Sequence, residues 1–388
     1  MNILFINTFD VSPTLGGTER ITDTLCREFT NSFSCKCYLA YYSSIDNHYT
    51  RTPFEDRLKL PNYKDVTPLI KFIHSRRIEA IILQGQFLSD TLKKELKGTQ
   101  IKIIFAHHLY PGAEKQFIRF SKFTPNRIKC KNRLISTSIR LLLYPLYKVY
   151  RRYRLPISYN NTYKYCDQIV LLSDKLIQPF IKFGRISASD KITVIPNSLS
   201  FNDFFPIYKL KEKEKIALIV SRLAENPKRI LFAIKAWEKI YPTAEQWKLV
   251  IVGTGADETM YKEYCKSKKV QNVFFEGNKD PLPYYQKASI FLMTSQLESW
   301  GLTITEAQQC GVVPVALNSY PSLTDIISNN ENGLITEDNN LDSYVNAIKL
   351  LIGNDSLRHK LASKSIDSAH RFESKSIAQK WINLINRL

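Results

Sequence analysis

The feature that most constrains the fold is a regular alternation of short apolar runs with longer segments of helical spacing, and it falls into two blocks. The first block has candidate strands at residues 2–7, 37–42, 80–84, 102–106, 168–172 and 192–195. The second has them at residues 216–220, 248–252, 273–275, 290–293 and 313–316. Strands that alternate with helices pair in parallel, with the helices as crossovers. The pattern therefore predicts an α/β chain with two doubly wound sheets.

The length of the chain also favours two domains, because 388 residues are too many for one compact core. Between the blocks, residues 198–215 are polar and charged and contain Pro206, which is typical of a linker. We expect an N-terminal domain over residues 1–200 and a C-terminal domain over residues 201–370. Apolar residues at helical spacing predict a last helix within residues 371–388.

Two carboxylates, Glu298 and Glu306, stand eight positions apart around an expected strand-to-helix turn. The helix is expected at residues 302–310, so its N-terminal amides would come from Trp300, Gly301 and Leu302. Unpaired amides at a helix N-terminus attract anions. Glu298 would lie beside such an anion, and Glu306 could turn toward hydroxyls of the same ligand. A phosphorylated sugar fits both positions, whereas the alternative is a plain βα unit with two solvated carboxylates.

Other polar residues follow the expected strands of the first block. Ligands of doubly wound sheets bind outside the carboxyl ends of the strands, so each such loop is a candidate wall of the site. Gly16 and Gly17 follow the first strand, and paired glycines let backbone amides approach an anion closely. His107 and His108 follow the strand at residues 102–106, although a histidine in this place can also be satisfied within a core. Asn197 follows the last strand of the block.

Cations follow the first strand of the second block. Arg222 and Lys228 flank one βα turn, with Arg229 as an alternative cation, and a departing diphosphate needs positive charge that is held rigidly. The competing interpretation is a basic surface loop. Gly253 and Asn278 end the next two strands.

These motifs together resemble the family-four retaining glycosyltransferases, in particular those of bacterial surface-polysaccharide synthesis. The segment from Glu298 to Glu306 is similar to the family's motif of Glu, seven residues and Glu, with Glu298-Ser299-Trp300-Gly301 in place of the usual Glu-Gly-Phe-Gly. The glycine pair, the Arg222 and Lys228 segments and Pro196-Asn197 are similar as well. The resemblance is strong over residues 218–333 and thin over residues 46–165. It implies the GT-B fold, in which two doubly wound Rossmann-like domains face a cleft and the terminal helix crosses back to the N-terminal domain.

The resemblance also implies a function and a set of roles. A hexose or N-acetylhexosamine would pass from a nucleotide-diphospho-sugar, UDP-sugar in preference to GDP-sugar, to a saccharide acceptor that is lipid-linked, in surface polysaccharide or lipopolysaccharide synthesis. Glu306 would bind the ribose and Glu298 the sugar ring, while Arg222 and Lys228 bind the diphosphate. The expected catalytic residues are His107, Glu298, Arg222 and Lys228. The expected donor-binding residues are Gly16, Gly17, His108, Asn197, Gly253, Asn278, Trp300, Gly301, Leu302 and Glu306.

Two rival functions stay open at this point. A nucleotide-sugar epimerase could share the fold, but it would need an acid and a base beyond His107 and His108. A basic nucleic-acid-binding protein would explain the charge, but not the four charged residues that each follow a strand. No metal and no cofactor are expected, because the chain has no Asp-x-Asp motif and its seven cysteines are scattered without metal-ligand spacing.

The net charge of +19 is unevenly placed, since residues 115–155 hold twelve basic residues and no acidic one. Aromatic and aliphatic residues are interleaved with these cations, and such surfaces bind anionic membranes. A solvated basic face and a single-stranded nucleic-acid surface are the alternatives. Without an apolar run of eighteen residues or a signal-peptide pattern at the N-terminus, we expect a cytoplasmic protein that is peripheral on the inner face of the plasma membrane.

Overall fold

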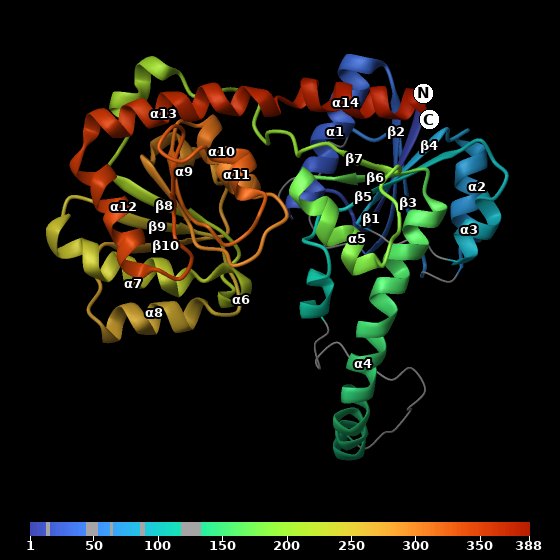
Figure 1. Ribbon diagram of the computed structural model, residues 1–388, viewed down its shortest axis with the longest axis horizontal. Coiled ribbons are helices and arrows are strands. Elements are labelled where there is room, and N and C mark those ends of the chain that lie inside the picture. The colour runs from blue at the N-terminus through green and yellow to red at the C-terminus, as the bar shows by residue number, and fades with distance from the viewer. Residues whose placement is uncertain (13–15, 44–52, 63–64, 86–89, 118–132) are drawn as a thin grey trace. The chain divides into compact units, whose positions relative to one another are not determined.

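The computed structural model describes residues 1–12, 16–43, 53–62, 65–85, 90–117 and 133–388 (Figure 1). The chain divides into two compact units. Unit 1 consists of Met1–Val11, Phe29–Ile195 and Asn383–Leu388, and unit 2 of Ser12–Glu28 and Pro196–Ile382. Helices α1 (Gly17–Phe33) and α14 (Ser374–Arg387) are therefore each divided between the units. The predicted domains divide the chain only at residues 200 and 370, and these boundaries stay a prediction.

Unit 1 is built on a seven-stranded sheet in which all paired strands are parallel. In spatial order its strands are β3 (Asp56–Lys59), β2 (Lys36–Ser43), β1 (Asn2–Phe9), β4 (Ala80–Gln84), β5 (Lys102–Ala106), β6 (Gln168–Leu171) and β7 (Ile192–Val194). The six predicted strands of the first block are confirmed within a few residues. The edge strand β3 was not predicted, because its sequence, Asp-Arg-Leu-Lys, is too polar to read as an apolar run.

The helices of unit 1 include one that leaves the domain core. They are α2 (Thr67–Ser75), α3 (Asp90–Leu96), α4 (Arg133–Tyr165) and α5 (Ile177–Gly184). Helix α4 packs against α5 through its C-terminal part, where Leu155 and Tyr159 are buried, and its N-terminal part extends away from the sheet of unit 1 (Figure 1). Residues 118–132, which carry part of the basic run, lie outside the described residues.

Unit 2 is built on a parallel six-stranded sheet. In spatial order its strands are β10 (Val273–Gly277), β9 (Lys248–Val252), β8 (Ile216–Val220), β11 (Ile290–Met293), β12 (Val313–Leu317) and β13 (Leu334–Thr336). The five predicted strands are confirmed. Strand β13 was not predicted, because its three residues stand alone within a polar stretch of the sequence.

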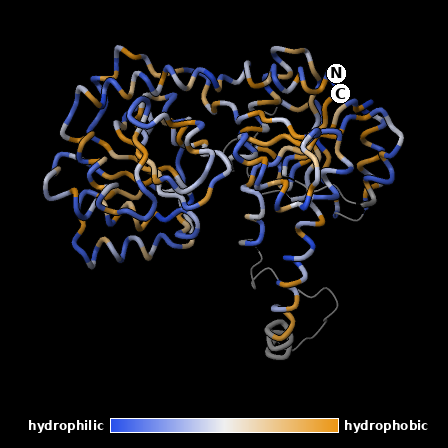
Figure 2. The backbone as a smooth tube through the Cα atoms, viewed as in Figure 1, coloured by the Kyte–Doolittle hydropathy of each residue, from blue (hydrophilic) through white to orange (hydrophobic). Residues whose placement is uncertain are grey.

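The helices of unit 2 bury apolar residues in its core, except for the short α6, which has no buried residue. They are α6 (Glu225–Lys228), α7 (Ile230–Ile240), α8 (Glu258–Ser267), α9 (Leu282–Lys287), α10 (Leu302–Gln309), α11 (Leu323–Ile326), α12 (Leu341–Gly353) and α13 (Asp355–Ala369). In α7, for example, Ile230, Ala233, Ile234 and Trp237 recur at helical spacing and are all buried in the core. Figure 2 shows the apolar strands inside each unit and the polar residues around them.

The segment expected to be a linker is packed into unit 2. Leu199 N–H donates to the carbonyl of Phe372 at 2.9 Å, and Phe205 N–H donates to that of Gln309 at 3.1 Å. Leu210 is buried in the core cluster of the unit. Residues 198–215 are therefore an ordered part of unit 2.

Both sheets reverse their strand order at one point, between β1 and β4 in unit 1 and between β8 and β11 in unit 2. Ligands of such sheets bind outside the carboxyl ends of the strands at this point. A ligand site in unit 2 is therefore expected at the loops that follow β8 and β11.

The described residues contain no cluster of three or more His, Cys, Asp or Glu side chains that would suit a metal ion. Six cysteines lie among them and all are free thiols, five of them buried. None of the described helices is both long enough and apolar enough to cross a membrane.

Candidate functional site

Lys228 and Glu298 meet at the switch point of unit 2. Lys228 ends α6, after β8, and Glu298 lies in the loop after β11, which pairs with β8. Their Nζ and Oε1 atoms are 2.5 Å apart, and both side chains are partly exposed, at 24% and 20%. The two loops are held together by hydrogen bonds from Gln296 N–H to the Pro227 carbonyl (2.8 Å) and from the Thr294 hydroxyl to the Lys228 carbonyl (3.0 Å). The pair is thus fixed by both loops.

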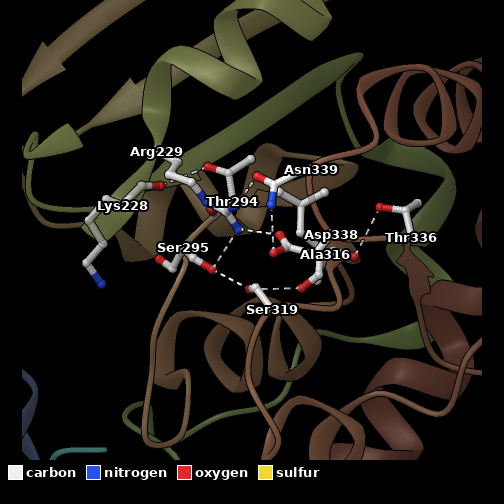
Figure 3. A network of polar contacts seen from close by, with 10 residues as sticks. Lys228, Arg229, Thr294, Ser295, Ala316, Ser319, Thr336, Asp338 and Asn339 are labelled. Atoms are coloured by element: carbon white, nitrogen blue, oxygen red, sulfur yellow. Dashed lines mark hydrogen bonds and ion pairs between the residues drawn. The ribbon is translucent and has the colours of Figure 1, made fainter. Parts of the chain in front are cut away.

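Arg229, the residue after Lys228, braces these loops (Figure 3). Its Nε donates to the Thr294 carbonyl at 2.8 Å, and its terminal nitrogens donate to Asp338 and Asn339, each at 2.7 Å. Only 13% of its side chain is exposed. Arg229 is therefore occupied in joining the loop after β8 to the loops after β11 and β13, whereas Lys228 extends to the other side.

Arg222 lies in the same loop but is exposed, and no ion pair of its guanidinium occurs within the described part of the chain. The neighbouring loop after β9 approaches this segment through its backbone. A Cβ atom at Gly253 would lie 1.9 Å from the Ser221 carbonyl oxygen, and one at Gly255 would lie 2.1 Å from that of Leu223. Glycine at these positions is required by the close approach of the two backbones.

The helix start expected after Glu298 is present. Helix α10 begins at Leu302, and its N-cap, Gly301, has a φ of 115°, which disfavours any residue with a side chain. A Cβ atom there would also lie 2.8 Å from the Tyr320 hydroxyl. Trp300 is buried and packs edge-on against Phe372. The N-terminal amides of α10 therefore begin three residues after Glu298, in an arrangement suited to an anion.

Glu306, in the second turn of α10, is fully buried. One carboxylate oxygen, Oε1, accepts hydrogen bonds from Arg20 and from the Ser200 hydroxyl, the latter at 2.7 Å. The other, Oε2, accepts one from the Tyr285 hydroxyl at 3.1 Å. The Glu306 carboxylate raises the pKa of Arg20, whose guanidinium thus stays charged. Sequence reasoning placed Glu306 here but gave no role to Arg20, Ser200 or Tyr285.

Gly16 and Gly17 precede Arg20, which is bonded to Glu306, in the sequence. Gly17 is the first residue of α1, and a Cβ atom there would lie 3.0 Å from the Leu302 side chain. Arg20 follows in the first turn, with its N–H bonded to the Gly16 carbonyl at 3.0 Å. Gly17 therefore lies against Leu302, and Arg20 pairs with Glu306, while the roles of Gly17, Leu302 and Glu306 in donor binding stay a prediction.

The two histidines of unit 1 have different surroundings. The His107 ring is 2% exposed and packs against Phe180, and its Nε2 lies 2.8 Å from the Tyr159 hydroxyl and 3.3 Å from Glu114 Oε1. Burial acts to raise the pKa of Glu114, but hydrogen bonds from His107 and Tyr159 lower it below its ordinary value. His107 is thus held within the unit by α4, and its predicted catalytic role stays a prediction.

His108 is bonded through Nε2 to the Gln84 side-chain oxygen at the end of β4. Burial, reinforced by His107, lowers the pKa of His108 to about 3, so the ring is neutral at physiological pH. Of the remaining predicted residues, Asn197 is buried at the start of the second part of unit 2, and Asn278 is exposed after β10. None of the hydrogen bonds within the described residues joins Asn278 to the Lys228–Glu298 pair.

Residues 200–367 match the family described as "Glycosyl transferases group 1". An uncharacterized glycosyltransferase of Haemophilus influenzae is 26% identical over 223 residues, which cover 57% of this chain and 61% of the relative. An N,N'-diacetylbacillosaminyl-diphospho-undecaprenol alpha-1,3-N-acetylgalactosaminyltransferase of Campylobacter jejuni is 24% identical over 249 residues, which cover 61% of this chain and 65% of the relative. The matched part of this chain thus spans less than two thirds of each of these relatives.

The fold is also that of solved structures. The S. aureus protein TarM, in a mutant form with fondaparinux, alpha-GlcNAc-glycerol and UDP, superimposes with a TM-score of 0.72 at 14% identity, and the match covers 99% of both chains. The predicted fold class, two doubly wound Rossmann-like domains of the GT-B type, is confirmed. The matched family and both relatives are glycosyltransferases, so an epimerase and a nucleic-acid-binding protein are not favoured.

Proposed function

We propose that the protein is a retaining glycosyltransferase, since residues 200–367 match the family of group 1 glycosyl transferases. It transfers a hexose or an N-acetylhexosamine from a nucleotide-diphospho-sugar to a saccharide acceptor in surface polysaccharide or lipopolysaccharide synthesis. The observation that carries the proposal is the Lys228–Glu298 pair at the switch point of unit 2, beside the N-terminus of α10.

The pair explains how a carboxylate and a diphosphate can share one site. A diphosphate would be repelled by Glu298 unless a cation stood between them, and Lys228 is in contact with that carboxylate. Lys228, Arg222 and the α10 amides stabilise the diphosphate as it leaves the anomeric carbon. Glu298 orients the sugar ring by accepting hydrogen bonds from its hydroxyls. The acceptor hydroxyl enters on the face that the diphosphate leaves, and the leaving phosphate takes its proton.

The relatives support particular substrates. TarM was solved with UDP, and the Campylobacter relative is named for an undecaprenol-diphosphate-linked acceptor and an alpha linkage. We therefore favour a UDP-sugar over a GDP-sugar as donor and a lipid-linked saccharide as acceptor. The reaction is proposed to need no metal, because Lys228, Arg222 and a helix N-terminus supply the positive charge that the diphosphate requires.

The donor is tested by titrating the full chain with UDP- and GDP-sugars in a calorimeter and by following turnover of the sugar that binds. The double variant Arg222→Gln/Lys228→Met should lower turnover by a factor of about 100 or more, the effect of removing preorganised charge from a transition state. Lys235→Met, an exposed lysine on α7, is the matched control and should keep its activity. EDTA should leave activity unchanged, and nuclear magnetic resonance of the product should show the anomeric configuration of the donor. A double variant with wild-type turnover would place the diphosphate elsewhere.

A second proposal concerns the membrane, and it is supported by an apolar face on α4. Five large apolar residues of this helix are 56% to 75% exposed: Leu142, Leu146, Val149, Tyr150 and Tyr153. At 3.6 residues per turn they fall within an arc of about 100°. Leu155 and Tyr159, which are buried in unit 1, fall on the opposite side of the same helix. The exposed apolar face is therefore separate from the buried side of α4 that packs into unit 1.

Cations stand on the same turns: Arg152 and Arg154 fall beside the apolar face and Arg151 falls opposite it, and all three are exposed. Apolar side chains that enter the headgroup region and cations that bind anionic lipid together define an interfacial helix. We therefore place the protein on the anionic inner face of the plasma membrane, where a lipid-linked acceptor is found.

Flotation with vesicles tests this placement. Wild type should float with anionic vesicles at low salt and much less at high salt, because each cation contributes on the order of 1 kcal/mol near anionic lipid. Arg151→Glu/Arg152→Glu/Arg154→Glu should abolish flotation, and Leu146→Ser/Val149→Ser should weaken it at every salt concentration. Leu350→Ser, which removes a residue 48% exposed in unit 2, should change nothing. Wild type that stays unbound on anionic vesicles at low salt would exclude the membrane and favour a soluble acceptor.

A further inference from the structure

We propose that Arg20 is a positioning residue of the donor site, which holds the Glu306 carboxylate ready for the ribose hydroxyls of the nucleotide. The inference rests on the proposed function, because it takes the ligand of unit 2 to be a nucleotide-diphospho-sugar. It goes beyond that function by assigning a part of the nucleotide site to α1, at the N-terminal end of the chain.

The burial of Glu306 is the first reason. Its side chain is 0% exposed. Removal of a carboxylate from water costs free energy unless an opposite charge and hydrogen bonds replace its hydration. Ser200 and Tyr285 donate neutral hydroxyl groups to it, and burial keeps Tyr285 protonated by raising its pKa well above the ordinary value. Arg20 is the cation in contact with this carboxylate, in an ion pair on Oε1. Arg20 therefore supplies the positive charge that compensates for the burial of this carboxylate.

The hydrogen-bonding capacity of Glu306 is the second reason. A carboxylate offers about four acceptor positions, and Arg20, Ser200 and Tyr285 use three of them. A vicinal diol that donates two hydrogen bonds must therefore replace one of the present donors. Exchange of a protein hydroxyl for a ribose hydroxyl is nearly neutral, whereas displacement of Arg20 would break a buried ion pair. Arg20 thus stays bound while the diol takes the place of a hydroxyl.

The position of Arg20 on α1 is the third reason. Gly17, one turn earlier, comes within van der Waals reach of Leu302 at the start of α10, and Glu306 is one turn further along α10. Two contacts one turn apart thus join the beginnings of the two helices. Arg20 fixes where the Glu306 carboxylate points, and it does so without being required to touch the nucleotide.

The test is a double-mutant cycle with UDP as the probe, measured by calorimetry on the full chain. Arg20→Gln and Glu306→Gln should each weaken UDP binding at least tenfold, and the double variant should bind no more weakly than the weaker single variant. Arg20→Lys keeps the charge and should recover part of the loss. Arg27→Gln, which removes another arginine of α1, one that forms an ion pair with Asp23, should bind UDP like wild type.

A second measurement separates positioning from a loss of fold. 2′-Deoxy-UDP should bind wild type several-fold more weakly than UDP, and Arg20→Gln should no longer distinguish the two nucleotides. In turnover, Arg20→Lys should raise the KM for the donor more than it lowers kcat. The thermal unfolding of each variant is measured as well. If Arg20→Gln does not fold, the inference is still tested by the Arg20→Lys variant and by the comparison of UDP with 2′-deoxy-UDP on wild type.

The two possible failures are distinguishable. Wild type that binds neither UDP nor GDP would overturn the proposed function. Wild type that binds UDP, with losses from Arg20→Gln and Glu306→Gln that add in the double variant, would show that Arg20 acts apart from Glu306. Equal binding of UDP and 2′-deoxy-UDP by wild type would likewise overturn the inference.

Discussion

His108 is a neutral imidazole at physiological pH, and this gives the protein a defined sensitivity to acid. An amide oxygen only accepts, so Nε2 carries the proton that His108 shares with Gln84. The pKa of His108 is lowered to about 3 by burial and by His107, from 6.5 in an unfolded chain. Below pH 6.5 the unfolded chain therefore binds a proton at His108 that the folded chain does not bind. The free energy of unfolding thus decreases as the pH falls.

We predict that acidification from pH 7 to pH 5 costs wild type about 2 kcal/mol of unfolding free energy at this residue. His108→Asn should lose correspondingly less over the same interval, because no imidazole is left to protonate. Urea denaturation of both proteins at the two pH values measures the difference. Equal losses would mean that the His108 ring accepts its proton in the folded state.

The sequence predicts the positions of some site residues but not the contacts of others. The loop positions of Glu298 and Lys228 could be predicted because each residue follows an apolar strand, and the strand order brings the two loops together. The ion pair of Arg20 with Glu306 joins residues 286 positions apart, and no local pattern marks it. The sequence offers Arg229 as an alternative cation, but its partners Asp338 and Asn339 come from a loop that no local pattern connects to it.

At the scale of elements, the loops after β8 and β9 depend on glycine for their contact. Gly253→Ala should destabilise unit 2 by about 2 to 4 kcal/mol, since its Cβ would overlap the Ser221 carbonyl and its φ is 130°. Gly277→Ala is the matched control, because it also has a positive φ, of 75°, but open space around it. It should cost about 1 kcal/mol. Denaturant unfolding followed by tryptophan fluorescence reports both, and equal costs would contradict a backbone clash.

The elements that sequence reasoning missed share a physical cause. Buried central strands are continuous apolar runs, so β1, β4, β8 and β11 are plain in the sequence. The two strands that were missed are short and give no apolar run, since β3 is itself polar and β13 has three residues within a polar stretch. Their hydrogen-bond partners lie in other parts of the chain, which a local pattern does not contain.

At the scale of the whole molecule, the last residues of the chain complete unit 1. Leu384 and Ile385 are buried, and the Ile385 carbonyl accepts a hydrogen bond from Lys102 Nζ at 2.9 Å. Removal of residues 383–388 should therefore destabilise unit 1 by about 3 to 6 kcal/mol, at about 1.5 to 3 kcal/mol for each buried side chain. Removal of the exposed residues 386–388 alone should have little effect.

The four tryptophans allow the two units to be followed separately, because Trp237, Trp247, Trp300 and Trp381 all belong to unit 2. Circular dichroism reports helices of both units. The shorter chain should lose part of its circular dichroism at lower urea than wild type, while its tryptophan transition stays in place. A tryptophan transition that shifts equally would show that the two units unfold together.

The divided composition of unit 1 sets the order in which the protein can fold during its synthesis. Domains commonly fold one after another as they leave the ribosome, the N-terminal one first. Here the N-terminal sheet emerges early, but the segment that closes it, residues 383–388, is translated after all of unit 2. The domain that begins first is therefore completed last, and until then the nascent chain carries an unfinished apolar surface that a chaperone can recognise.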